Sequence, residues 1–360
     1  MQITRDSSGL RSALTTWTDP QGALSCVVVI KGTYKVHDGR LRPSEHQRDC
    51  ETIDSYEGEP GSSSLRSEND FAPYKPAIDV LVRGHAWAPK GRPCTDCVVE
   101  LRVGAASKRL RVHGDRVWRP GVVGLVPGVG HPFERQPLRW ELAYGGTTKA
   151  GCEQLNPVGV GLADGVSEHE AVGSRAPSIE SLDAPIQRWG PRYLPAGLAA
   201  IARSWQPRLA AAGTFDDAWR RDRFPLLPDD FGFEHFQVAP PDQRVATLAP
   251  GTAIAVAGMS RAGLFVAEVP PPPPLVHFHF DDRVVERTAM LDTIVLEPEP
   301  GLLLASWRTR VPLGRKPALL REIVIGPRRG PKPRRSAKPH FRSLGEFVTW
   351  AKRRRGVQRS

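Results

Sequence analysis

The sequence has no long apolar segment. No uncharged apolar run approaches the ~20 residues that a membrane-spanning helix needs. The first residues, MQITRDSSGL, lack the apolar core of a signal peptide, so we expect neither membrane insertion nor Sec-type export. Cysteine is also scarce, and the five residues are Cys26, Cys50, Cys94, Cys97 and Cys152. So sparse and odd a set does not suit a disulfide framework, and it predicts a reducing, cytoplasmic location.

The sequence also lacks the short motifs of several large enzyme classes. It contains no Gly-x-Ser-x-Gly nucleophile elbow and no Walker motif. Gly159, Gly161 and Gly165 match a dinucleotide-binding loop only loosely, because they do not join a strand to a helix. Acidic pairs such as Asp229-Asp230 are adjacent residues, whose side chains point apart in a helix or strand. We therefore predict a protein that is not an enzyme and needs no cofactor.

A carbohydrate-active or hydrolytic β-protein is the alternative to that prediction. Its candidate acids are Glu68, Asp70, Asp229 and Asp230. Such an enzyme requires a cleft in which two carboxylates converge at ~5–10 Å.

The positive charge is confined to the end of the chain. The formal net charge is +11, and residues 326–360 account for all of it, so residues 1–325 are neutral. Nucleic-acid binding is therefore a hypothesis about this tail alone. The alternative interpretations of the tail are a solvated extension and a helix that docks on an acidic partner. Ser343 and Glu346 form a capping box before the amphipathic segment FVTWAKRRR. We thus divide the chain into a β-rich domain, 1–326, and a basic tail with a short helix, 327–360.

Glycine and proline are abundant, with 34 and 35 residues. Both interrupt helices and form turns, so the composition argues against a helical bundle. Residues between about 120 and 235 are especially rich in them, and we interpret this region as a loop and short-helix insertion. The predicted fold is mainly β, as a sandwich or a distorted barrel with this central segment packed between its two halves.

Runs of β-branched and aromatic residues, bounded by glycine, proline and aspartate, mark the expected strands. They span residues 23–36, 77–88, 97–103, 108–118, 136–144, 252–257, 264–269, 275–280, 292–297, 302–308 and 319–325. Two helices are predicted, at 199–212 and 214–223, the second with Thr214 as its N-cap.

Two short patterns could hold a metal. Cys94 and Cys97 have the spacing of half a zinc site, and His277 and His279 share one face of a strand. Neither pattern has an identifiable set of further ligands. We expect no metal at either place, with a strand junction and a half-buried strand as the structural interpretations.

Polar and aromatic clusters outside simple periodicity carry a family resemblance. In order, they are Val27–Tyr34, Asp70-x-Ala-Pro-Tyr-Lys-Pro76 with Asp79, Gly114-Asp-Arg-x-Trp118, Tyr144-Gly-Gly146, Asn156-Pro-x-Gly159, Trp205-Gln-Pro-Arg208, Gly213-Thr-Phe-Asp216 with Trp219, Phe224-Pro-Leu-Leu-Pro-Asp-Asp-Phe231, Leu291-Asp-Thr293 and Trp307-Arg308. This series resembles a domain-of-unknown-function family that is encoded beside type VI secretion effectors and acts as effector adaptors or chaperones. It covers residues 20 to 325, with departures such as Ser178 where the family has asparagine.

The resemblance implies a bacterial, cytoplasmic adaptor. Its partners would be a cognate type VI effector, bound through the effector's N-terminal segment, and the spike-tip protein of the secretion machine. For the loop surface that contacts the effector, we predict five aromatic anchors: Tyr74, Trp118, Tyr144, Trp205 and Trp219. For the remaining motif residues we predict structural roles: Asp70, Lys75, Asp79, Asp115, Arg116, Asn156, Arg208, Asp229 and Asp230.

Overall fold

β-strands far outweigh helices in the part of the chain that the structure describes, at 41% against 9%. The computed structural model describes residues 2–37, 39–104, 106–314 and 319–327. All of these except Pro327 belong to the unit Met1–Gly326. The mainly β class is confirmed, and among the described strands the sheets remain open, which agrees with a sandwich and not with a closed barrel. The predicted basic tail and its helix lie outside the described residues, apart from Pro327.

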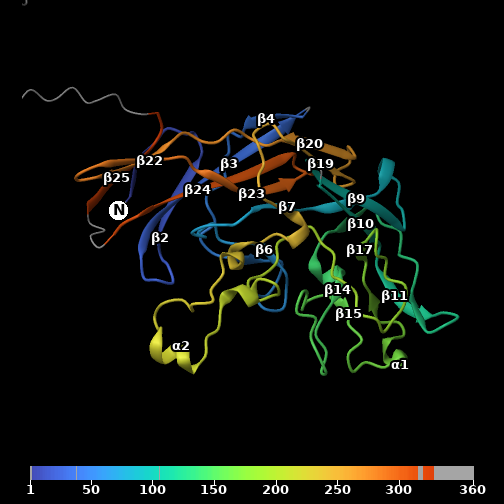
Figure 1. Cartoon of the computed structure of the whole chain (residues 1–360). Helices are drawn as coiled ribbons and strands as arrows, with labels where there is room; N and C mark the ends of the chain where they lie inside the picture. The colour runs from blue at the N-terminus through green and yellow to red at the C-terminus, as the bar shows by residue number, and fades with distance from the viewer. Residues whose placement is uncertain (1, 38, 105, 315–318, 328–360) are drawn as a thin grey trace, which may run out of the picture. The chain divides into compact units, whose positions relative to one another are not determined.

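The largest sheet joins the two ends of this unit. Its strand order is β18-β7-β23-β24-β3-β2, and β4 also pairs with β3. The strands are β2 (Arg11–Thr18), β3 (Leu24–His37), β4 (Arg40–Pro43), β7 (Ile78–Val82), β18 (Arg244–Val245), β23 (Met290–Glu297) and β24 (Leu302–Pro312). β24 is antiparallel to both β3 and β23, whereas β23 runs parallel to β7. Strands from the first and last thirds of the chain therefore lie side by side (Figure 1).

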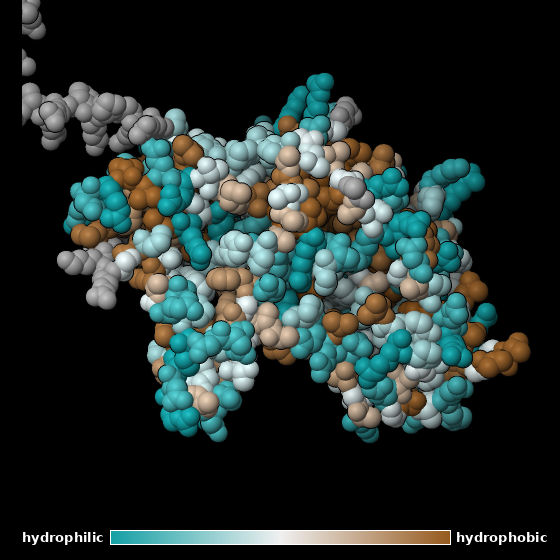
Figure 2. Space-filling model, viewed as in Figure 1, coloured by the Kyte–Doolittle hydropathy of each residue, from teal (hydrophilic) through white to brown (hydrophobic). Residues whose placement is uncertain are grey.

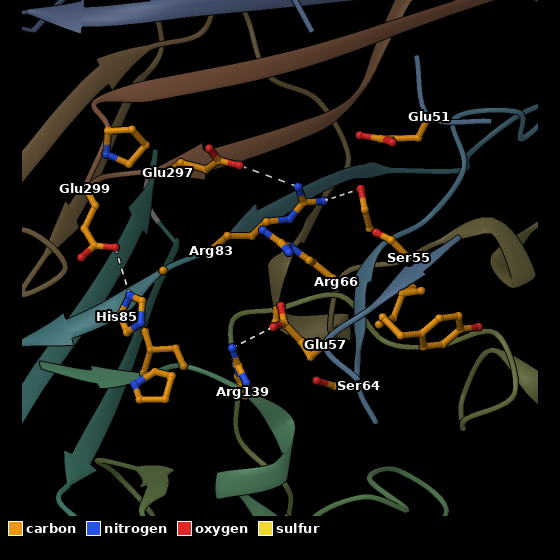
Figure 3. A pocket seen from close by; sticks show the side chains of 18 of the residues that line it. Glu51, Ser55, Glu57, Ser64, Arg66, Arg83, His85, Arg139, Glu297 and Glu299 are labelled. Atoms are coloured by element: carbon orange, nitrogen blue, oxygen red, sulfur yellow. Dashed lines mark hydrogen bonds and ion pairs between the residues drawn. The ribbon is translucent and has the colours of Figure 1, made fainter. Parts of the chain in front are cut away.

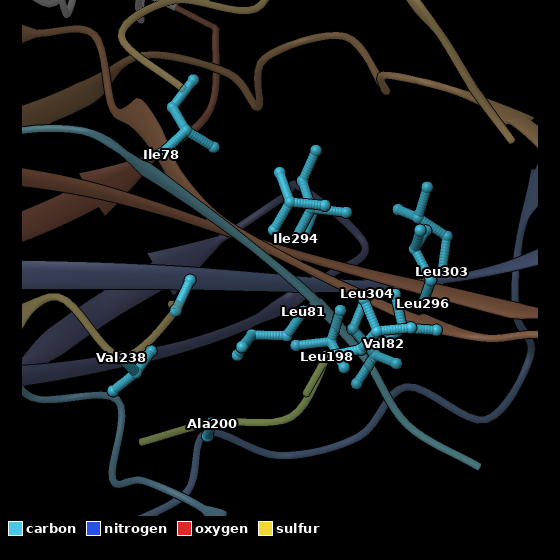
Figure 4. Packing of buried hydrophobic residues seen from close by; sticks show 14 of the residues in the cluster. Ile78, Leu81, Val82, Leu198, Ala200, Val238, Ile294, Leu296, Leu303 and Leu304 are labelled. Carbon is cyan, nitrogen blue, oxygen red and sulfur yellow. The ribbon is translucent and has the colours of Figure 1, made fainter. Parts of the chain in front are cut away.

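The two faces of this sheet differ in chemistry. Successive side chains of a strand point to opposite faces, so Asp79 and Leu81 share one face and Val80 and Val82 the other. Loops that carry Leu198, Ala200 and Val238 run along the strands, and Figure 4 shows these side chains packed near Leu81. The polar groups on the Asp79 face are therefore buried beneath loops, where they need partners within the protein.

Two further sheets complete the main framework. The five-stranded sheet has the order β17-β10-β9-β19-β20, and the four-stranded sheet has the order β1-β25-β21-β22. Their strands are β1 (Ile3–Asp6), β9 (Asp96–Val103), β10 (Ala106–His113), β17 (Ile179–Ser181), β19 (Ala253–Ala257), β20 (Leu264–Glu268), β21 (Val276–Phe280), β22 (Val284–Arg287) and β25 (Leu320–Ile325). One hydrophobic cluster includes residues of all three sheets, so they share a core.

Short strand pairs organise the connecting segments. They are β5 (Ser55–Tyr56) with β6 (Leu65–Ser67), β8 (His85–Trp87) with β13 (Arg135–Pro137), β14 (Tyr144–Gly145) with β15 (Val160–Gly161), and β11 (Arg116–Pro120) with both β12 (Leu125–Pro127) and β16 (Arg175–Ala176). The α-helices are α1 (Glu168–Ala171) and α2 (Asp217–Asp222), beside 3-10 turns at Pro89–Gly91, Trp140–Leu142, Leu209–Ala212, Phe233–Phe236 and Pro241–Gln243. None of the described helices is long and apolar enough to span a membrane.

Both helix predictions need correction. Residues 199–212 form no α-helix, and only Leu209–Ala212 makes a 3-10 turn. The backbone N–H of Ile201 donates to the Val238 carbonyl, so the start of this Ala-rich stretch bonds to another loop. The second helix is shorter than predicted, and Asp216 caps it. Thr214 instead donates its hydroxyl to Asp230.

Three predicted strands are interrupted. The strand expected at 77–88 breaks between β7 and β8 at Gly84, whose φ of 135° suits glycine. The strand expected at 108–118 breaks at Gly114, where a side chain would collide with the backbone of His131. Residues 136–144 are strand only at their two ends, with a 3-10 turn between. The later strands lie close to their predicted positions.

Candidate functional site

A buried carboxylate fastens two loops to the main sheet. Asp79 on β7 is fully buried and accepts hydrogen bonds from Lys75 Nζ at 2.8 Å and Gln237 Nε2 at 2.9 Å. The backbone N–H groups of Val238 and Ala239 donate to the same carboxylate, both at 3.0 Å. We name Asp79 with these four partners the Asp79 latch. It holds the segment before β7 and the loop at 237–239 together on one face of the sheet.

A second ion network lies beside it on the same face. Lys31 Nζ is 2.8 Å from Asp70, whose carboxylate also accepts the backbone N–H of Glu51. Arg308 pairs with Asp292 and donates to the backbone carbonyl of Asp70. The predicted structural residues Asp70, Lys75 and Asp79 thus hold chain segments in place.

Other motif residues also bond to the protein interior. Asn156 is fully buried and donates to the carbonyls of Trp140 and Tyr144. Arg208 donates to the carbonyls of Ile201 and His235 and to the carboxylate of Glu68. Each side chain joins backbone groups of separate loops.

The Gly114-Asp-Arg-x-Trp motif includes a buried ion pair. Arg116 and Glu180 are both buried, with 2.9 Å between Nη2 and Oε2, and His113 Nε2 lies 2.9 Å from the other carboxylate oxygen. Burial by itself would raise the pKa of Glu180, but His113 and Arg116 outweigh it and lower that pKa below its ordinary value. Asp115 points outward and accepts a hydrogen bond from Gln136.

Three of the five predicted aromatic anchors are buried. Trp118, Tyr144 and Trp205 are 1%, 2% and 5% exposed, so they cannot form a contact surface in this structure. They pack against other aromatic rings of the insertion, which explains why a loop-rich segment keeps large aromatics. Tyr74 and Trp219 do reach the surface, the first with 46% of its area exposed and the second partly.

Tyr74 belongs to a cluster of partly exposed rings. Its ring centroid is 5.3 Å from that of Phe233, and Phe233 is 5.6 Å from Trp17 on β2. The guanidinium of Arg310 lies over both Tyr74 and Phe233, at 5.9 and 6.0 Å. Phe231 and Phe236 extend the cluster. We name these residues the aromatic surface: Trp17, Tyr74, Phe231, Phe233, Phe236 and Arg310.

Trp219 contributes to a different surface, around α2. Its ring contacts Phe215 and Phe224, which are 53% and 68% exposed. Trp219 also lines a shallow hollow of about 270 Å³ together with Asp229 and Asp230. Asp229 pairs with Arg223, and Asp230 accepts hydrogen bonds from Thr214. Figure 2 shows that the visible face around α2 is otherwise largely hydrophilic.

A pocket with a volume of about 590 Å³ is lined by charged side chains. Its walls come from the β5–β6 pair, the β7–β8 junction, the β23–β24 turn and the residues after β13 (Figure 3). It contains four arginines and four glutamates: Arg48, Arg66, Arg83, Arg139, Glu51, Glu57, Glu297 and Glu299. We name it the charged pocket.

Most of these charges are paired inside the pocket. Both oxygens of Glu297 accept hydrogen bonds from Arg48, at 2.8 and 2.6 Å. Arg139 lies 3.0 Å from Glu57, and Glu299 contacts His85 at 3.0 Å. The pocket can therefore exchange hydrogen bonds with a polar or charged ligand.

Arg66 and Arg83 have no carboxylate partner of their own among the described residues, since Arg83 shares Glu297 with Arg48. Arg83 is 3.8 Å from Glu297 and donates to the Ser67 hydroxyl at 3.1 Å. Burial lowers the pKa of the Arg83 guanidinium, although the charges of Glu297 and Glu51 act in the opposite direction. Arg66 is exposed on β6 and has no ion pair with any residue that the structure describes.

The two suspected metal patterns gain no further ligands. Within the described ranges, no group of three or more His, Cys, Asp or Glu residues could hold a metal ion. Cys94 and Cys97 are free thiols, and burial raises the pKa of Cys97 to about 12. His277 is buried on β21, with Nε2 2.9 Å from the carbonyl oxygen of Gly326, and its ring lies 6.5 Å from that of His279.

The four acids of the hydrolytic alternative lie in two separate places, neither of them the charged pocket. Glu68 contacts Arg203 and Arg208, and Asp70 pairs with Lys31; both line a narrow space of about 40 Å³ beneath the loops. Asp229 and Asp230 lie beside α2. None of the four lines the charged pocket.

Sequence reasoning missed the charged pocket and most of the aromatic surface. Two local signals pointed to them. One is the Glu297-Pro-Glu299-Pro turn between two apolar strands, which places two carboxylates at one sheet end. The other is the sequence Phe231-Gly-Phe-Glu-His-Phe236, in which the aromatic residues are too dense for an ordinary loop.

Comparison with known proteins gives one family. The profile of that family matches residues 21–308, the span that carries the latch, the aromatic surface except Trp17 and Arg310, and the charged pocket. No curated protein and no solved structure matches the chain. Because the match covers most of the sequence, the protein belongs to the family described as "Uncharacterized protein conserved in bacteria (DUF2169)".

Proposed function

We propose that this protein is a non-enzymatic adaptor or chaperone that binds and stabilises a cognate type VI secretion effector in the bacterial cytoplasm. The observation that carries the proposal is the aromatic surface. Trp, Tyr and Arg dominate the binding energy of protein interfaces, and here partly exposed rings gather around Phe233 beneath an arginine. The ordered motif series supports the type VI context.

The neighbouring strand suggests how a partner segment would bind. β2 ends the largest sheet and pairs only with β3 among the described strands. Its sequence, RSALTTWT, has no proline, although edge strands are commonly protected by proline, charges or bulges. Trp17 belongs both to this edge and to the aromatic surface. An extended effector segment could add to β2 through its backbone while apolar side chains contact the rings.

Co-expression with the product of the adjacent putative effector gene tests the proposal. The full chain and a chain ending at Gly326 should both be tried, because the second isolates the contribution of the tail. We expect co-purification and a more soluble effector. An effector that is soluble alone and never co-purifies would contradict the proposal.

Single substitutions then test the surface itself. Tyr74→Ala and Phe233→Ala should each weaken binding by about 2 kcal/mol, or about 30-fold, because they remove anchors of the interface. Leu194→Ala is the matched control, since Leu194 is 82% exposed and lies outside the aromatic surface. Melting temperatures of the free variants separate lost binding from lost folding. Unchanged affinity of both folded variants would refute the assignment of this surface.

A further inference from the structure

The charged pocket has more cationic than anionic groups at one end. Glu297 accepts hydrogen bonds from Arg48 and also lies 3.8 Å from Arg83, so two guanidinium groups share one carboxylate. Glu51 lines the pocket but pairs at 3.7 Å with Lys31, which does not line it. Arg66 adds a further positive charge without an ion-pair partner in the described part of the chain. Figure 3 shows the side chains of Arg66 and Arg83 within this pocket.

These groups suit an anion. A guanidinium offers a planar set of N–H donors that matches the two oxygens of a carboxylate. Arg83 is 25% exposed, so an interaction with it is screened less by water than one on an open surface. The hydroxyls of Ser55 and Ser67 line the same pocket and can donate or accept further hydrogen bonds.

The surrounding carboxylates restrict the charge of that anion. Glu51, Glu57, Glu297 and Glu299 also line the pocket, so a phosphate with close to two negative charges would meet strong repulsion there. A single carboxylate needs one cationic fork and suffers less repulsion. The volume of about 590 Å³ falls in the range of small-ligand sites and would hold a side chain with its adjoining peptide groups.

We propose that the charged pocket binds a carboxylate group of an extended peptide segment, with Arg66 and Arg83 as the residues that hold it. The identity of the segment as part of an effector rests on the function proposed above, whereas the carboxylate site itself does not. A free small carboxylic acid would present the same chemistry, and the experiment distinguishes the two sources.

The first experiment measures binding of small probes to the full chain by calorimetry or ligand-observed NMR. The probes are acetyl-Gly-Asp-Gly-amide, the neutral acetyl-Gly-Asn-Gly-amide, succinate and inorganic phosphate. We expect the aspartyl peptide to bind at least tenfold more tightly than the other three. Equal binding of the aspartyl and asparaginyl peptides would overturn the carboxylate site. Tighter binding of phosphate would overturn the argument from the glutamates, and tighter binding of succinate would overturn the peptide source.

Arg66→Ala should weaken binding of the aspartyl peptide about tenfold, because it removes one charged donor. Arg66 is exposed, so this variant should keep the melting temperature of the wild type. Arg111→Ala is the matched control: Arg111 is an exposed strand arginine that does not line the pocket. Equal affinity of the Arg66 variant and the wild type would overturn the assignment of Arg66.

Effector capture separates this inference from the adaptor proposal. Suppose that Arg66→Glu captures the effector as well as the wild type does, and that the aspartyl peptide does not bind the wild type. The pocket inference then fails while the adaptor proposal stands. If no effector is captured but the aspartyl peptide binds selectively, the carboxylate site stands and the adaptor proposal fails. Loss of capture in Arg66→Glu, with capture retained in Arg111→Glu, supports both.

Discussion

Removing the Asp79 carboxylate should destabilise the protein strongly. Asp79 is fully buried, with 0% of its surface exposed, and the side chain of its partner Lys75 is 6% exposed. In Asp79→Ala, the Lys75 ammonium stays buried without its ion-pair partner, and the N–H groups of Val238 and Ala239 lose their acceptor. Losing one partner of a buried ion pair costs ~3–5 kcal/mol, and each buried donor left without a partner adds ~1–3 kcal/mol.

We therefore expect Asp79→Ala to lower the free energy of unfolding by about 4 kcal/mol or more. For the unit Met1–Gly326, that corresponds to a fall in melting temperature of at least roughly 6 °C. Calorimetry and urea unfolding followed by tryptophan fluorescence would measure both quantities. Asp183→Asn is the control, because its pair with Arg109 is exposed and should be worth less than ~1 kcal/mol.

A double variant tests the physical cause. Lys75→Met together with Asp79→Ala removes the buried ammonium as well as the carboxylate, so it should recover part of the lost stability. The reasoning would be refuted if Asp79→Ala unfolded within about 1 kcal/mol of the wild type. It would also be refuted if the double variant were less stable than the sum of the two single changes predicts.

Three further predictions follow from the buried contacts. Because the pKa of Glu180 is lowered in the fold, its stabilisation should be present above the ordinary carboxyl pKa and be lost as the pH falls through the lower value. The difference in unfolding free energy between wild type and Glu180→Gln should thus become smaller as the pH falls from 7 to 3. The same difference at both pH values would contradict this. Because burial raises the pKa of Cys97 to about 12, alkylation of this thiol by iodoacetamide should be at least ~100-fold slower than in unfolded protein. Because the described residues include no group that could hold a metal ion, a chelator should leave the melting temperature unchanged. Finally, Gly145→Ala should lower stability by well over ~1 kcal/mol, because φ is 147° and a Cβ would collide with the Asn156 backbone; Gly58→Ala, with no atom closer than 3.4 Å to its Cβ, is the control. Equal unfolding curves for the two glycine variants would disprove the steric argument.

The strands were predictable where the signal is local. The apolar run of β3 and the runs of β19 and β24 are bounded by turn residues, and the structure places strands there. The helix prediction for residues 199–212 was wrong because alanines favour a helix only when nothing else binds the backbone of the segment. Here Val238 and the side chain of Arg208 take the backbone groups of Ile201.

The site was less predictable, because it depends on which segments meet. Trp118 and Tyr74 are both aromatic residues near charged neighbours and glycine or proline, yet one is buried and the other is 46% exposed. Without a regular period, a loop sequence does not tell which of its aromatics face the core. The charged pocket combines segments from 48–67, 83–85, 137–139 and 297–300, and each is an ordinary polar loop until the sheet brings them together.

The pairing of β3 with β24 sets the order of events during translation. Val29 pairs with Arg308, so the buried apolar run of β3 has no neighbour on that side until the ribosome has made almost the whole domain. At 5–20 residues per second, the delay is on the order of tens of seconds. During that time β3 has β2 as its early hairpin partner, through pairs such as Val29 with Ala13. Nascent chains that stop before β24 should therefore aggregate, and slow synthesis of the middle of the gene should lower the yield of folded protein.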